Sequence, residues 1–87
     1  MLYQVKPLIY TRHAKNRMRL HKVSAEEIEH TLAHPDFKQP SIKMRINVWK
    51  KLQDGKYLRI ACREEPSRTM VISVARKKKP SKGVALK

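Results

Sequence analysis

The chain has 87 residues, 21 of them Lys or Arg and seven Asp or Glu, which gives a formal net charge of +14. That length allows one domain with one modest hydrophobic core, while a single cysteine, Cys62, excludes an internal disulfide framework. No apolar run approaches the length of about 20 residues that a membrane-spanning helix needs, which argues against an integral membrane protein.

The charge excess predicts a polyanionic partner, because the mutual repulsion of so many cations opposes compaction unless another molecule neutralises them. Nucleic acid is the polyanion that we expect, and a general adaptation to solubility is the alternative. The first residues lack the long apolar stretch of a signal peptide, and a lone thiol fits a reducing compartment. We therefore expect a cytoplasmic protein without a membrane partner.

A short strand and a helix are predicted first. Leu8 to Tyr10 follow a proline, which suits the beginning of a strand. Thr11 has the side chain of an N-cap for a helix through about Leu20. Ala14 and Met18 are four residues apart and would form the apolar line of that helix.

A second helix has a clearer beginning. Ser24 and Glu27 have the spacing of a capping box, and Pro35 would end the helix. The expected buried stripe consists of Ala25, Ile28 and Leu32. Three of the seven acidic residues lie on this helix, so we expect it to face away from a polyanion.

From Ile42 onward, apolar residues recur at every second position, which is typical of strands with one dry and one wet face. The alternation runs from Ile42 to Trp49, returns from Leu58 to Cys62, and returns again from Met70 to Val74. It predicts a three-stranded antiparallel meander whose dry face the helices cover. The expected fold class is α+β, with two N-terminal helices on a three- to four-stranded antiparallel sheet (β-α-α-β-β-β).

Turn chemistry predicts the register of the sheet. A three-residue loop, residues 53–55, with Gly55 left-handed, keeps apolar and charged faces apart and pairs Trp49 with Arg59. A five-residue loop from Glu64 to Arg68 would then place Ser73 beside Arg59. Around this row, the wet face would carry Lys43, Arg45, Lys51, Tyr57 and Arg63.

This wet face is the predicted nucleic-acid-binding surface. Cationic groups bind phosphates, and the ring of Trp49 offers a stacking platform for an unpaired base. The alternative is a cation–π pair between Trp49 and Arg59 that only stabilises the sheet. After the domain at residues 1–76, residues 77–87 are basic and lack apolar periodicity, so we expect a disordered cationic tail.

Two pairs of residues, one of a histidine with an arginine and one of two histidines, have the four-residue spacing of one helical face. His13 and Arg17 on the first helix have the chemistry to move a proton and to stabilise a phosphorane-like transition state. A histidine at the rim of the core beside a solvated arginine is the alternative. His30 and His34 lack further ligands, so we predict no metal site, and Cys62 is expected in the core.

The segment from Tyr10 to Met18, Y-T-R-H-A-K-N-R-M, resembles the Y-T-x-H-A-x-x-R-M motif of an uncharacterised bacterial domain family. Val23-Ser24 and Ile28, then Leu58-Arg59-Ile60 and Ile72-Ser73-Val74, are similar to its later motifs. The resemblance covers roughly residues 8–75. It implies a place among RelE/ParE-like toxins, within the barnase–colicin–RelE-like nuclease fold.

What the resemblance implies is a RelE-like toxin: a metal-independent endoribonuclease that needs no cofactor and cleaves RNA, free or ribosome-bound, by internal attack of the 2′-hydroxyl. The implied catalytic residues are His13, Arg17, Arg59 and Ser73. An acidic antitoxin would be a second partner. Two alternatives stay open: a non-catalytic nucleic-acid-binding module, and a ParE-like inhibitor of another protein.

Overall fold

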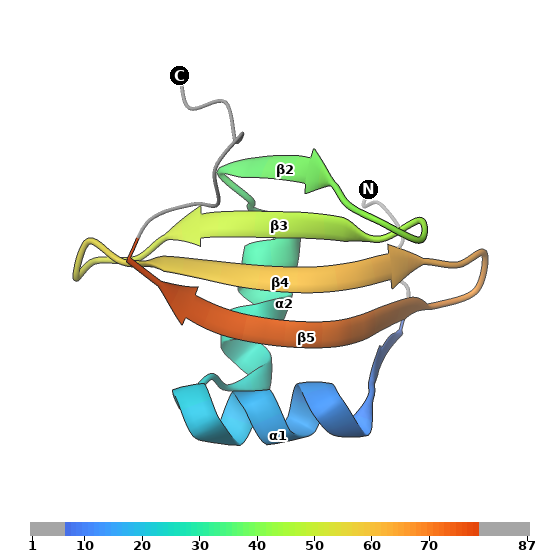
Figure 1. Cartoon of the computed structure of the whole chain (residues 1–87), viewed down its shortest axis with the longest axis horizontal. Helices are drawn as coiled ribbons and strands as arrows, with labels where there is room; N and C mark the ends of the chain where they lie inside the picture. Colours follow the sequence, from blue (N-terminus) through green and yellow to red (C-terminus); the bar gives the residue numbers. More distant parts are fainter. Residues whose placement is uncertain (1–6, 79–87) are drawn as a thin grey trace.

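The computed structural model describes residues 7–78. Strand β1 (Leu8–Tyr10) leads into helices α1 (Arg12–His21) and α2 (Ala25–Ala33). Four strands follow: β2 (Phe37–Pro40), β3 (Ile46–Lys51), β4 (Tyr57–Glu64) and β5 (Thr69–Lys77). They form one sheet in the order β1-β5-β4-β3-β2, in which only the β1–β5 pair is parallel (Figure 1). The class is α+β, as predicted.

Both predicted helix beginnings are confirmed. The Oγ1 of Thr11 accepts a hydrogen bond of 3.0 Å from the amide of Ala14, which satisfies one of the donors that a helix start leaves without a partner. Ser24 and Glu27 form the complete capping box, with bonds of 3.1 and 3.0 Å. Helix α1 extends to His21, one residue further than expected.

The predicted β3–β4 register is also confirmed. The amide of Leu52 donates to the carbonyl of Lys56 at 2.7 Å, so the loop between them has three residues, and Gly55 has a φ of 87°. Val48 therefore pairs with Ile60 on one face. On the other face, Trp49 pairs with Arg59.

The expected sheet of three to four antiparallel strands is wrong in strand number and in direction. Strand β2 was not predicted, and β1 lies parallel to β5 at the edge of the five-stranded sheet. The predicted strand from Ile42 begins only at Ile46. Before it the chain turns, with φ of 54° at Lys43 and 64° at Met44, and Met44 is 84% exposed. The apolar residues Ile42 and Met44, which suggested a strand, are therefore exposed in a turn.

The prediction that Ser73 lies directly beside Arg59 is wrong, because Ser73 lies opposite the next residue of β4 on the same face and not opposite Arg59 itself. Arg59 pairs with Ala75, and Ser73 pairs with Ala61. The cause is a tight β4–β5 turn, in which Glu65 and Arg68 bond each other's backbones. This turn pairs even-numbered residues of β4 with odd-numbered residues of β5, as in the pair of Cys62 and Val71. A bulge at Ile72 then shifts the register by one residue, so that Ala61 pairs with Ser73 and odd-numbered residues of both strands share one face.

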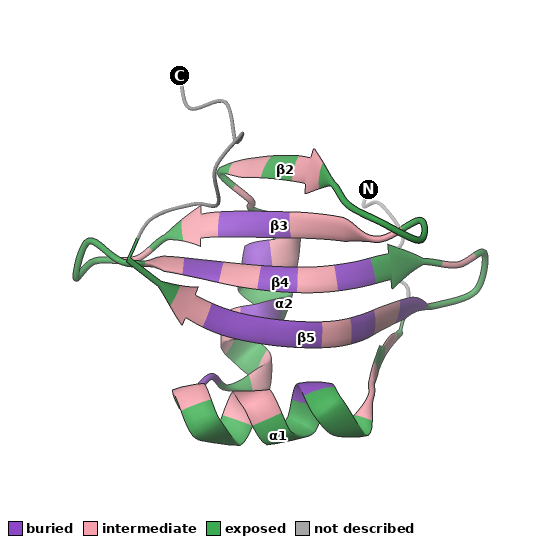
Figure 2. Cartoon of the chain, viewed as in Figure 1, coloured by how far each residue is buried: buried purple, intermediate pink, exposed green. Residues whose placement is uncertain are grey.

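The hydrophobic core lies between the helices and one face of the sheet. Ile28 of α2 and Ala14 of α1 are fully buried there (Figure 2). The strand residues of the core are Val48, Leu58, Ile60, Cys62, Val71 and Val74. Cys62 is 2% exposed, so its predicted place in the core is confirmed.

The predicted cationic tail, residues 77–87, falls largely outside the described residues, which end at Lys78; Lys77 itself closes β5. Within residues 7–78, no helix combines the length and apolarity that crossing a bilayer requires.

Candidate functional site

Strand β1 pairs only with the first residues of β5, Thr69 to Val71, and helix α1 lies beside β5. Thr11, between β1 and α1, donates from its amide to the carbonyl of Val71 at 3.1 Å and from its hydroxyl to the carbonyl of Ile72 at 3.0 Å. The helix then runs along β5 (Figure 1). In this position the helix places Ala14 in the core, where it is fully buried.

We call the face of the sheet opposite the core, which carries Trp49, Arg59, Ser73 and Ala75, the outer face; α2 lies behind the sheet when this face is viewed (Figure 1). Its chemistry centres on Arg59, whose Nη2 donates to the Oγ of Ser73 at 3.4 Å. Burial lowers the pKa of Arg59, and the neighbouring Arg17 lowers it further. Arg17 from α1 is thus near enough to Arg59 from β4 for their charges to repel each other, and Arg59 in turn contacts Ser73.

Within residues 7–78, no carboxylate compensates the charges of these two guanidinium groups. The Nε atoms of Arg17 and Arg59 are buried, and neither has a hydrogen-bond partner in the described part of the chain. No carboxylate of residues 7–78 forms an ion pair with either side chain. Like charges held close together with unsatisfied donors favour an anion between them, and the planar guanidinium matches phosphate well. We call Arg17, Arg59 and Ser73 the arginine cluster.

The structure adds His21 to this cluster. It lies one helical turn after Arg17, and its pKa is lowered by burial and then by the charges of Arg17, Arg76, Lys77 and Arg59. Its imidazole is therefore neutral at pH 7. The four-residue spacing from Arg17 was present in the sequence, but the helix was expected to end at Leu20, which left His21 out.

Arg76 fixes the end of α1. Its Nε donates to the carbonyl of His21 at 2.8 Å and its Nη2 to the carbonyl of Lys22 at 3.0 Å. The same nitrogen lies 3.5 Å from Glu27 of α2. A cation at a helix C-terminus satisfies carbonyls and complements the helix dipole. Arg76 thereby holds His21 in place beside β5.

His13 lies one turn before Arg17 on α1, and its side chain is exposed. No hydrogen bond within the described residues connects it to Arg59 or Ser73. Of the four predicted catalytic residues, the structure joins Arg59 to Ser73 by a hydrogen bond and places Arg17 where its charge acts on Arg59, whereas His13 is exposed on the same helix as Arg17.

The prediction of an exposed Trp49 is wrong, because its side chain is 0% exposed. Phe37, from the unpredicted strand β2, stacks on the indole with centroids 6.1 Å apart, and Tyr57 meets it edge-on at 6.5 Å. The Nε1 of Trp49 donates to the Oε1 of Gln39 at 3.4 Å. In this arrangement the indole is a packing element of the outer face and offers no platform to a base.

The other predicted binding residues are scattered. Lys43 lies in the turn before β3, and Arg45 is half-buried with an Nε that lacks a partner within residues 7–78. Lys51 is exposed at the end of β3, opposite the half-buried Tyr57. Arg63 forms an ion pair with Glu65 at 2.9 Å, and the same carboxylate also pairs with Arg68 at 2.7 Å.

His30 and His34 have ring centroids 5.0 Å apart at the end of α2. Among residues 7–78, no group of three or more His, Cys, Asp or Glu side chains is arranged to hold a metal ion.

Comparison with known proteins identifies a family and no activity. Residues 10–76 match the family described as "Domain of unknown function (DUF4258)". Searches among curated proteins and among solved structures gave no match. The matched segment begins at Tyr10 and ends at Arg76, so it includes α1, the core and the arginine cluster. Since it spans most of the chain, this protein belongs to the DUF4258 family.

Proposed function

We propose that this domain is a RelE-like endoribonuclease that binds a phosphate of single-stranded RNA at the arginine cluster. The observation that carries the proposal is that the Nε donors of Arg17 and Arg59 are both buried and lack partners within residues 7–78, while the charge of Arg17 acts on Arg59 and lowers its pKa. A phosphodiester would supply both the missing charge and the missing acceptors. The formal charge of +14 supports a polyanion as the ligand.

The proposed chemistry needs an anion site and a proton acceptor. The 2′-oxygen of the RNA attacks phosphorus while its proton passes to an imidazole. The bond from phosphorus to the 5′-oxygen breaks, and that oxygen takes a proton from water, leaving a 2′,3′-cyclic phosphate and a 5′-hydroxyl. Arg17 and Arg59 stabilise the charge that develops on the phosphoryl oxygens, and the hydroxyl of Ser73 donates to one of them.

Two histidines can accept the proton, one turn to either side of Arg17. His13 belongs to the motif on which the resemblance to RelE/ParE-like toxins rests. His21 has the neutral imidazole that a general base requires, because its pKa is lowered. Both are part of the proposal, and their variants distinguish them.

Cleavage of a labelled single-stranded RNA by the purified full chain tests this function, with and without ribosomes. We expect Arg59→Gln to abolish cleavage and weaken binding, and either His13→Ala or His21→Ala to abolish cleavage while binding is kept. Lys56→Gln, an equal charge change in the exposed β3–β4 turn, is the matched control. Intact RNA under every condition with the wild type would refute the enzymatic claim.

A second candidate is a non-catalytic RNA-binding module that uses the same cluster. The exposed position of His13, without a hydrogen bond to Arg59 or Ser73 in the described residues, favours it. This candidate predicts RNA binding that falls steeply with salt, since each neutralised phosphate releases a counterion. It also predicts that His13→Ala and His21→Ala leave RNA unchanged in every assay.

A further inference from the structure

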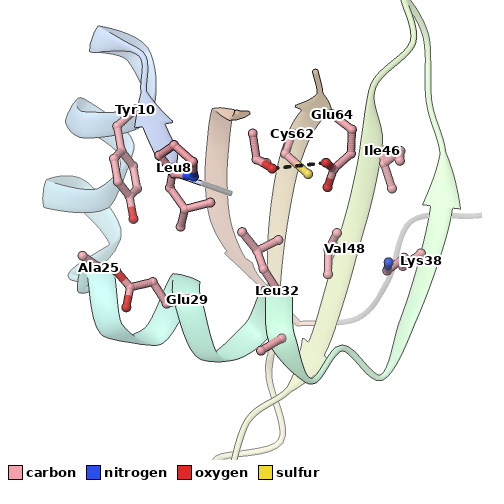
Figure 3. A pocket seen from close by; sticks show the side chains of 13 residues that line it. Leu8, Tyr10, Ala25, Glu29, Leu32, Lys38, Ile46, Val48, Cys62 and Glu64 are labelled. Carbon is pink, nitrogen blue, oxygen red and sulfur yellow. Dashed lines mark hydrogen bonds between the residues drawn. The ribbon is translucent and has the colours of Figure 1, made fainter. Parts of the chain in front are cut away.

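The side of the sheet opposite the arginine cluster contains an open cavity of about 640 Å³ between β1, α2 and strands β3 and β4 (Figure 3). Small-molecule sites typically enclose about 300–1,000 Å³, with mostly apolar walls and a few convergent polar groups. The apolar walls here consist of Leu8, Leu32, Ile46, Val48 and Cys62. Size and lining are therefore those of a ligand site.

One end of the cavity is polar and acidic. The hydroxyl of Tyr10 is buried and has no hydrogen-bond partner within residues 7–78, and Glu29 of α2 lines the same end (Figure 3). Burial raises the pKa of Tyr10, and the negative charges of Glu29 and, to a smaller extent, Glu26 raise it further. No cation of residues 7–78 forms an ion pair with Glu29. Tyr10 and Glu29 thus place a phenolic hydroxyl and a carboxylate at the same end of the cavity, and within residues 7–78 neither a hydrogen bond to the hydroxyl nor an ion pair of the carboxylate is formed.

The negative charge of Glu29 at this end of the cavity favours a positively charged ligand. A buried polar atom without a partner is unfavourable, and a ligand that donates to it recovers that cost. An ammonium group donates to a phenolic oxygen and a carboxylate at once, whereas a second carboxylate would be repelled. The only basic side chain in the described lining, Lys38, lies at the far end of the cavity, beyond Val48 (Figure 3).

The wall between the two ends is apolar at Leu32, Val48 and Cys62, and the charged residue of the described lining that lies beside Cys62, Glu64, accepts a hydrogen bond of 3.2 Å from the hydroxyl of Thr69 (Figure 3). Cys62 is 2% exposed, and burial raises the pKa of its thiol to about 11, so the thiol is neutral at physiological pH. Leu32 and Val48 face the same space (Figure 3). A ligand that fits must therefore be apolar along its body.

We propose that this cavity binds a small amphipathic cation, with its ammonium group between Glu29 and the hydroxyl of Tyr10 and its apolar body against Leu32 and Val48. The site lies on the opposite face of the sheet from Arg59, and so the proposal does not rest on the proposed RNA function.

The test is titration of the ¹⁵N-labelled full chain with 2-phenylethylammonium, followed by amide chemical shifts. We expect shifts confined to β1, α2 and the facing parts of β3 and β4. The uncharged isostere 2-phenylethanol should bind about tenfold more weakly, since it lacks the charge-assisted hydrogen bonds. Equal affinity for the two probes, or shifts elsewhere in the protein, would overturn the proposal.

Two variants and one control locate the ammonium group. Glu29→Gln should weaken binding about fivefold or more. Glu26→Gln is the same charge change at an exposed position of α2 outside the lining, from which the charge acts on Tyr10 less than that of Glu29 does, and it should weaken binding about twofold or less. Tyr10→Phe should weaken binding and raise the melting temperature, because it removes a buried hydroxyl without a partner. Equal effects of Glu29→Gln and Glu26→Gln would contradict the placement.

Discussion

The guanidinium of Arg59 donates a hydrogen bond of 3.4 Å to the hydroxyl of Ser73, which lies diagonally across the β4–β5 pair. Arg59 is half-buried beside a second guanidinium, that of Arg17, and both circumstances lower its pKa. Burial of a cation next to another cation opposes folding. Such an arrangement is expected where stability is sacrificed for the binding of an anion.

The first prediction separates stability from binding at Arg59. Arg59→Met keeps the apolar stem and removes the charge, so the free energy of unfolding should stay unchanged or rise by about 1 kcal/mol. RNA affinity should fall about tenfold through loss of charge-assisted hydrogen bonds to phosphate. Urea denaturation and fluorescence anisotropy measure the two quantities. A clear loss of stability together with unchanged affinity would mean that Arg59 is structural.

Trp49 should behave as a core residue. Because its indole is 0% exposed and packs against Phe37 and Tyr57, Trp49→Ala should lower the free energy of unfolding by about 3–5 kcal/mol. In the wild type, acrylamide should quench its fluorescence poorly, both in free protein and in the presence of RNA. Strong quenching in the free protein that RNA suppresses would instead indicate an exposed stacking platform.

Much of the fold was predictable because it depends on local chemistry. Thr11 and Ser24 lie where their oxygens cap helices, and Gly55 allows the left-handed turn that fixes the β3–β4 register. From that register, the shared face of Trp49 and Arg59 followed directly. These features need only neighbouring residues, so the sequence pattern indicates them.

Non-local pairing was not predictable in the same way. The parallel contact of β1 with β5 joins residues about sixty positions apart, from Leu8 to Thr69, and no local pattern specifies it. Strand β2 has only four residues and contains Pro40, and because proline is unfavourable within strands, the sequence pattern did not indicate it. Burial of Trp49 depends on Phe37 of that missed strand, and so the error about the indole follows from the error about β2.

His21 gives the protein a pH-dependent stability. Its pKa in the folded protein lies below 6.5, so the unfolded chain binds more protons as the pH falls below about 7. Stability should therefore decrease as the pH falls through the folded pKa and should be unaffected by this group at higher pH. His21→Gln should show a smaller loss of urea midpoint between pH 7.5 and pH 5 than the wild type.

The control for that experiment is His30→Gln, which changes an exposed histidine of α2. It should follow the pH dependence of the wild type more closely than His21→Gln does. An equal reduction in both variants would show that the effect does not arise from the cationic surroundings of His21.

Cys62 should be inert in the native protein. Burial raises the pKa of its thiol to about 11, with a further increase from Glu64 and an opposing effect of Lys38. At pH 8 about one thiol in a thousand is then a thiolate, which is the reactive form. The thiol should react with 5,5′-dithiobis(2-nitrobenzoate) only after unfolding in urea. Rapid reaction of the folded protein would contradict the burial of this side chain.

The central claim is that Arg17 and Arg59 together form a phosphate site, and a pair of α1 variants tests it most directly. Arg17→Gln and Lys15→Gln remove the same charge from the same helix, but Lys15 is exposed whereas the Nε of Arg17 is buried in the cluster. In anisotropy titrations with a labelled single-stranded RNA at fixed salt, Arg17→Gln should weaken binding about tenfold and Lys15→Gln about twofold or less. Equal losses of RNA affinity in the two variants would show that binding depends only on the overall charge of the protein, and would contradict a defined phosphate site.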